Sequence, residues 1–190
     1  MDRRTFITAL GATTLGVSLP ATPMQWKHCK IIGVGGAGCN FIDACQTTAI
    51  LSPRSGWSNE LICVDASTEI LHEFLVTFSA WLFDADSVIL VAGVGGETGS
   101  RFMPMMARLA REAGAFATAA VIMPFDWEGD WRTGRASSAL RQVEQEADLV
   151  RYFSNQELMN SLGDQVTQTE FYSIQEKYIA SFIRDLLGKG

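Results

Sequence analysis

Two glycine-rich segments have the residue types and spacing needed to hold phosphate groups. The first is GVGGAG, from Gly33 to Gly38, which fits the pattern G-x-G-x-x-G. The second is GVGGETGS, from Gly93 to Ser100. Glycine lets the backbone approach a phosphate, and the N-terminus of a following helix supplies free N–H groups and a positive dipole. Either loop alone could be a tight turn, so the pair is a stronger indication of nucleotide binding than one loop.

Polar and aromatic residues elsewhere could complete such a site. Asp65 ends an apolar run and could bond a ribose hydroxyl, as the acid after the second strand does in dinucleotide-binding folds; it could equally cap a helix. Trp127 and Trp131 flank Glu128-Gly129-Asp130 and could form part of a pocket wall.

Alternating strands and helices are predicted to position these loops. Apolar, β-branched runs predict strands at 29–35, 61–65, 87–93, 116–124 and 148–154. Helical periodicity predicts helices at 40–50, 68–83, 102–113 and 132–146, and Thr167-x-x-Glu170 is a capping box that opens a last long helix. This order predicts an α/β fold, a three-layer Rossmann-like sandwich with a mostly parallel sheet, whose ligands bind at the carboxyl ends of the strands.

Composition excludes several classes of protein. The 190 residues are 47% hydrophobic and 19% charged, which is typical of one folded domain and too apolar for disorder. A net charge of -6 disfavours general nucleic-acid binding. The four cysteines contain no C-x-x-C pair and there are two histidines, so neither a zinc site nor a disulfide scaffold is predicted. We expect reduced, mostly buried thiols.

The first residues differ from the rest. Arg3-Arg4 precede an uncharged, moderately apolar stretch up to Leu19, similar to a twin-arginine export signal. The stretch is too short and too rich in Gly and Thr for a stable membrane span. A start at Met24 is the alternative. We therefore expect a signal-like or non-structural segment at 1–23 and one domain at 24–190, in the cytoplasm or, if the signal works, exported.

The order of motifs resembles a known family. KIIGVGGAGCNFID, CVDAS, DADSVILVAGVGGETGS, AAVIMPFDWEGDWR and FSNQEL resemble, over about residues 29–187, the nucleotide-binding domain of FtsZ, the tubulin-like cell-division GTPase. The resemblance implies GTP or GDP as ligand, with Mg²⁺ as a candidate cofactor. It assigns the phosphates to Gly35, Gly36, Ala37, Gly38, Asn40, Gly95, Gly96, Thr98, Gly99 and Ser100. It assigns the ribose to Glu128, with Arg132 nearby. Guanine is assigned to Asn155 and Phe171.

Departures from the family pattern set expectations of their own. Glu97 replaces a signature glycine, where a carboxylate would repel phosphate unless it turns outward or a cation intervenes. Arg101 replaces the last signature glycine and could contact phosphate. Gln175 stands at the family's guanine-recognising aspartate. The interval from Asp65 to Asp84 is short, without the loop that senses the γ-phosphate, and the family's catalytic acidic loop and second domain do not follow the last helix.

Together these observations predict an FtsZ-like protein that binds a guanine nucleotide with weak or no hydrolysis and serves cell division or filament assembly. Its expected partners are full-length FtsZ or a second copy of the chain. One alternative is an NAD-type Rossmann oxidoreductase, supported by G-x-G-x-x-G and Asp65. The other is a decayed, non-enzymatic interaction module, supported by Glu97.

Overall fold

The computed structural model describes residues 26–48, 51, 58–65, 77–163 and 165–188. Its centre is a five-stranded sheet with the order β2-β1-β3-β4-β5. Every neighbouring pair is parallel. The strands are β1 (His28–Val34), β2 (Ser58–Val64), β3 (Ser87–Gly93), β4 (Phe116–Met123) and β5 (Leu149–Ser154). The predicted α/β fold with a parallel sheet is confirmed.

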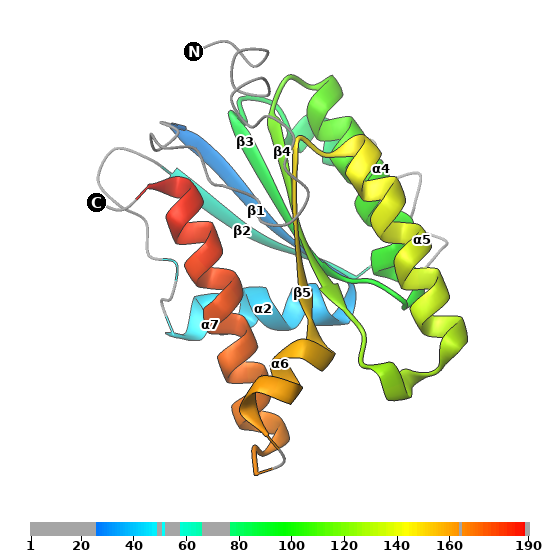
Figure 1. Ribbon diagram of the computed structural model, residues 1–190. Coiled ribbons are helices and arrows are strands. Elements are labelled where there is room, and N and C mark those ends of the chain that lie inside the picture. Colours follow the sequence, from blue (N-terminus) through cyan, green and yellow to red (C-terminus); the bar gives the residue numbers. More distant parts are fainter. Residues whose placement is uncertain (1–25, 49–50, 52–57, 66–76, 164, 189–190) are drawn as a thin grey trace.

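Helices cover both faces of this sheet and give the three layers (Figure 1). The helices with described bounds are α2 (Gly35–Thr48), α4 (Glu97–Glu112), α5 (Asp130–Glu146), α6 (Asn155–Leu162) and α7 (Gln168–Leu187). One core cluster joins the sheet to α4 and α5, and a second joins the opposite face to α2 and α7. Both clusters are built from strand residues that are almost fully buried, as the continuous apolar runs predict.

The strand order places the two glycine loops side by side. From β1 the chain proceeds outward to β2, and the strands after it lie on the other side of β1, in the order β3-β4-β5. The direction of winding therefore changes between β1 and β3. In parallel sheets such a point opens a crevice at the carboxyl ends of the strands, and the loops after β1 and β3 both lie there.

Most predicted elements are present, and several have other bounds than predicted; α4, for example, begins at Glu97 instead of residue 102. The helix expected from residue 40 begins at Gly35, directly after β1, because Gly35 adopts a φ of +70° that starts the turn without a connecting loop. Helix α6 and the short 3₁₀ helix Asp126–Glu128 were not predicted. Of the helix expected at 68–83, residues 77–81 are helical and 66–76 lie outside the described residues.

The long last helix begins as its sequence predicts. Glu170 N–H donates to Thr167 Oγ1 at 3.3 Å, and Glu170 Oε2 accepts from Thr167 N–H at 2.9 Å. This reciprocal capping box fixes the start of α7. As a result Phe171 and Gln175, on successive turns of α7, lie buried against the sheet end.

The prediction that all four cysteines are reduced and mostly buried is wrong for one pair. Cys39 in α2 and Cys63 in β2 form a disulfide, with Cα atoms 4.9 Å apart, and Cys63 is exposed. The pair has no sequence motif because its members are 24 residues apart and meet only when α2 folds back over β1 and β2. Cys29 and Cys45 are free and buried, as expected.

Within the described residues, no helix is long and apolar enough to cross a membrane.

Candidate functional site

A cavity of about 720 Å³ lies at the carboxyl ends of the strands. Both glycine loops, the segment after β4, the start of α6 and the start of α7 line it. This is the position that the winding of the sheet favours for a ligand. Charged side chains in the lining gather near the glycine loops, whereas the residues from α6 and α7 are neutral.

The two glycine loops touch each other at the cavity. A Cβ atom placed on Gly35 would lie 3.3 Å from Thr98 Cβ in the second loop. A Cβ atom placed on Gly36 would have nothing within 4 Å, so this position faces open space. Helices α2 and α4 start at these loops, and the first N–H groups of a helix have no partner within the helix. Two helix N-termini therefore converge on one place, where they favour an anion.

The second loop is held by its own side chains and by α5. Gly95 has a φ of +97°, and its N–H donates to Ser100 Oγ at 2.8 Å. A Cβ atom placed on Gly96 would lie 3.8 Å from Arg132 Nη2. Glu97 is the first residue of α4, is exposed and lines the cavity. The loop thus carries one carboxylate and lies close to one guanidinium.

Glu128 and Arg132 form an ion pair at the edge of the cavity. Arg132 Nε lies 3.0 Å from Glu128 Oε2. The other carboxylate oxygen, Glu128 Oε1, accepts from the N–H of Phe125 at 2.7 Å, which closes the 3₁₀ turn after β4. This ion pair places the guanidinium beside the second glycine loop.

The opposite end of the cavity combines aromatic rings with amides. Phe125 stacks on Trp127 with ring centroids 4.1 Å apart, and its centroid lies 5.2 Å from that of Phe171. The amide of Gln175 donates through Nε2 to Oδ1 of Asn155, and both side chains are buried. This end can accept a flat apolar ring and can both donate and accept hydrogen bonds at its edge.

The structure brings ten of the predicted site residues into the cavity lining: Gly35, Gly36, Ala37, Gly96, Thr98, Gly99, Glu128, Arg132, Asn155 and Phe171. The other five, Gly38, Asn40, Asp65, Gly95 and Ser100, do not line it. Gly38 packs against β3 instead. Ser100 accepts a hydrogen bond from the N–H of Gly95 and so stabilises the second glycine loop without lining the cavity. Ligand contacts by all fifteen residues stay predictions.

Some lining residues were not predicted, and others were expected to line the cavity and do not. Met159 lies on α6, a helix that was not predicted from the sequence. Tyr172 also lines the cavity, but in the sequence only its neighbour Phe171 was identified as a candidate. Trp127 lines the cavity as expected, but Trp131 does not, because it stacks with the Arg135 guanidinium at 3.7 Å. Arg101 is exposed outside the lining and lies over the Phe102 ring.

Neither a metal cluster nor a reactive free thiol belongs to the described part of this site. No group of three or more His, Cys, Asp or Glu residues there could hold a metal ion alone. Burial raises the pKa of Cys29 and of Cys45 to about 12, so both free thiols stay protonated at neutral pH.

Comparison with known proteins gives consistent results. The sequence model of the Tubulin/FtsZ family, GTPase domain, matches residues 65–163. The cell division protein FtsZ of Mycoplasmopsis pulmonis is 28% identical over 75% of this chain and 43% of its own length. FtsZ 1 of Halobacterium salinarum is 30% identical over 70% of this chain and 40% of its own. The chain thus spans less than half the length of these curated relatives.

Solved structures show the same fold. An empty FtsZ dimer from M. jannaschii matches with a TM-score of 0.71 and 20% identity, over 86% of this chain and 55% of that one. A GTPγS-bound protofilament of CetZ2 from Haloferax volcanii matches with a TM-score of 0.68 and 21% identity, over 84% and 58%. Because the family model covers more than half of the sequence, the chain belongs to the Tubulin/FtsZ family and contains its GTPase-domain fold.

Proposed function

We propose that the chain binds a guanine nucleotide, GTP or GDP, in the cavity at the carboxyl ends of β1, β3 and β4. The observation that carries the proposal is the contact between the two glycine loops, which aims two helix N-termini at one place. Phosphates fit there because Gly36 leaves open space and Arg132 supplies a positive charge.

The sugar and the base take the rest of the cavity in this proposal. The Glu128 carboxylate, held by Arg132, can accept from ribose hydroxyls. The guanine ring lies against the aromatic group of Phe125, Trp127 and Phe171. Its edge offers two donors and an acceptor, and the amides of Asn155 and Gln175 supply the complementary acceptors and donor. The replacement of an aspartate by Gln175 therefore leaves guanine recognition chemically possible.

A magnesium ion is part of this proposal at the phosphate end. Mg²⁺ is commonly bound by one or two carboxylates together with substrate phosphates. The exposed Glu97 carboxylate, beside the second loop, is suited to such a shared ion. The ion would also relieve the repulsion between Glu97 and the phosphates. We further propose weak or no hydrolysis by this chain, because the two carboxylates of the described lining, Glu97 and Glu128, are assigned here to the ion and to the ribose, which leaves neither to activate a water.

Assembly and location follow from the same family. The similar structures include an FtsZ dimer and a CetZ2 protofilament. We propose that this chain associates with itself or with a longer FtsZ, in cell division or filament formation, and that it does so in the cytoplasm, where nucleotide is abundant. Export through the Arg3-Arg4 segment stays a prediction, and it lies outside the described residues.

Titration of the purified chain with fluorescent GTP and GDP, with and without Mg²⁺, tests the proposal. We expect saturable binding that is lost in Gly96→Glu, which places a carboxylate beside the phosphate position. Fluorescent NADH is the matched ligand control, because an oxidoreductase would bind it preferentially. A folded chain that binds none of these ligands would contradict the proposal and favour the interaction module, which co-sedimentation with full-length FtsZ then tests.

A further inference from the structure

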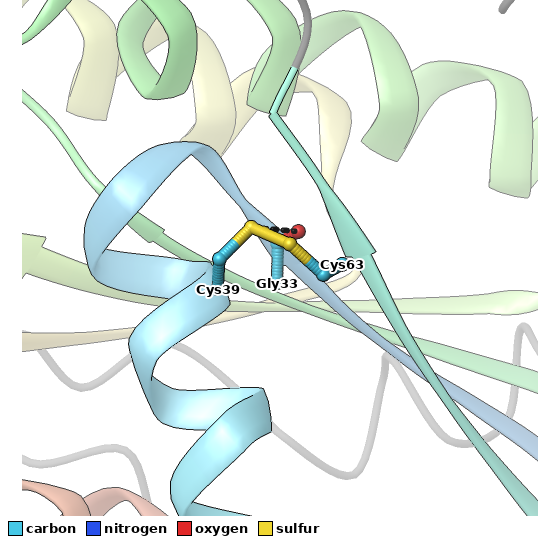
Figure 2. Close-up of a disulfide and its surroundings, with 3 residues drawn as sticks. All are labelled: Gly33, Cys39 and Cys63. Carbon is cyan, nitrogen blue, oxygen red and sulfur yellow. Dashed lines mark hydrogen bonds between the residues drawn. A yellow bond between two sulfur atoms is a disulfide. The ribbon is translucent and has the colours of Figure 1, made fainter.

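The disulfide between Cys39 and Cys63 joins helix α2, directly after the first glycine loop, to the edge of the sheet. Cys39 lies near the start of α2, and Cys63 is the next-to-last residue of β2 (Figure 2). Strand β2 is an edge strand that pairs with β1. The bond therefore ties the edge strand to the helix whose N-terminus faces the cavity.

Three segments converge tightly on this bond. Gly33 of β1 is in register with Cys63, and its carbonyl oxygen lies 3.9 Å from Cys39 Sγ. A Cβ atom placed on Gly33 would lie 2.2 Å from the Gly38 carbonyl oxygen. The end of β1, the first turns of α2 and the end of β2 are thus packed around the disulfide. The last four residues of the first glycine loop, Gly35 to Gly38, directly precede Cys39 in α2.

The two cysteines of the pair differ in exposure. Cys63 is exposed, whereas Cys39 is 9% exposed. An incoming thiolate must reach one sulfur of a disulfide and expel the other. Because Cys63 is the exposed residue of the pair, we expect attack at Cys63 Sγ with Cys39 Sγ as the leaving group.

The remaining described thiols do not compete in this exchange. Cys29 and Cys45 are 1% and 2% exposed. Their raised pKa, about 12, keeps them protonated, and a protonated thiol is a poor nucleophile. Thiol exchange is therefore confined to the Cys39–Cys63 pair.

We propose that Cys39–Cys63 is a thiol–disulfide switch on nucleotide binding: the disulfide holds the first glycine loop in its binding geometry, and reduction by a dithiol weakens binding. A thiolate of the dithiol attacks Cys63 Sγ, the S–S bond breaks, and Cys39 leaves as a thiolate that takes up a proton. The second thiol of the reductant then displaces Cys63. Two electrons pass to the protein, which gains two thiols while the dithiol becomes a disulfide.

The test measures affinity for a fluorescent GDP analogue with the full chain, before and after treatment with dithiothreitol; it rests on the proposed function. We expect roughly tenfold weaker binding after reduction, as when about a tenth of the molecules keep the competent loop. Cys63→Ser should bind like the reduced chain under both conditions. Cys45→Ala, which removes a buried thiol outside the pair, should keep the response. Maleimide labelling of denatured protein should show that reduction adds two reactive thiols.

Each other outcome has a defined meaning. Equal affinity in both redox states, or no gain of thiols on reduction, would overturn the switch. If neither form binds nucleotide although reduction adds two thiols, the proposed function fails and the switch has no ligand to act on. Redox control of the geometry of the first glycine loop is then tested by amide hydrogen exchange of α2: faster exchange on reduction would support it, and unchanged exchange would overturn it.

Discussion

The first and second glycine loops follow the same backbone plan but have different surroundings. Each connects a parallel strand directly to a helix, β1 to α2 and β3 to α4. The first loop carries no charged side chain from Gly33 to Gly38 and is tied to β2 by a disulfide. The second carries Glu97 and lies against Arg132 of α5.

The glycines that both loops contain are required by packing, whereas the residues that differ between the loops face the cavity or solvent, where a ligand could bind. A Cβ atom on Gly38 would lie 2.2 Å from the Val91 carbonyl oxygen, and one on Gly99 would lie 2.1 Å from the Gly93 carbonyl oxygen. These contacts demand glycine whether or not a phosphate binds. Gly36 faces open space, and Glu97 is exposed. Function is therefore best tested at the positions where packing leaves the choice of residue open.

Substitution of the packed glycines should have the largest effect. Gly38→Ala and Gly99→Ala must shift backbone atoms of β1 or β3, so we expect each to lower the free energy of unfolding by about 3 kcal/mol. Gly36→Ala is the control, because it has open space and replaces a helical glycine; it should be neutral or stabilising by up to about 1 kcal/mol. Urea unfolding measures all three. If all three substitutions lowered the free energy of unfolding equally, packing would not explain which of these positions require glycine.

Removal of Arg132 should have the next largest effect, on binding. Loss of a charged hydrogen bond costs about 2 kcal/mol, so Arg132→Ala should weaken GTP binding about 30-fold. Arg135→Ala is matched in charge, but Arg135 stacks on Trp131 outside the cavity lining. It should change affinity less than about twofold, because Arg135 lies outside the lining and salt screens its charge. Similar losses in both variants would mean that only net charge matters.

Much of the fold was predictable from the sequence because it depends on local patterns. Buried parallel strands are continuous apolar runs, and β3 has the predicted bounds. The capping box located the start of α7. Helix α6 was missed because its pattern is short, with Asn155 its only buried residue. The 3₁₀ turn after β4 depends on one contact of Glu128.

The site was predictable only in part because it is assembled across the sheet. The glycine loops could be found from spacing and context, but their contact depends on the strand order β2-β1-β3, which the structure supplies. The pair of Asn155 and Gln175 joins residues 20 apart in different helices, so only the fold brings their amides together. The Cys39–Cys63 bond depends likewise on the register of β2 against β1. No local pattern contains this information.

Neutralising Glu97 should have a smaller, opposite effect on binding. Its carboxylate lies at the cavity, so Glu97→Gln should strengthen GTP binding about fivefold, or about 1 kcal/mol, at low salt without Mg²⁺. Glu112→Gln, at the other end of α4, makes the same charge change and should leave affinity nearly unchanged. The gain should decrease with added salt or Mg²⁺. Because Glu97 is proposed to share the ion with the phosphates, the gain should become a loss at saturating Mg²⁺, and an unchanged gain in Mg²⁺ would contradict that role.

The smallest expected effect concerns why a carboxylate is tolerated in this loop. Glu97 lies in the first turn of α4, where the helix dipole favours negative charge, so Glu97→Gln should lower the free energy of unfolding by about 0.5 kcal/mol. Glu112 is at the C-terminal end, where the dipole disfavours a carboxylate, so Glu112→Gln should raise it slightly. Thermal unfolding at low salt measures both. If the two variants change the free energy of unfolding in opposite directions, the Glu97 carboxylate stabilises α4 through the helix dipole. If both change it in the same direction, the dipole does not explain why a carboxylate is tolerated at this position.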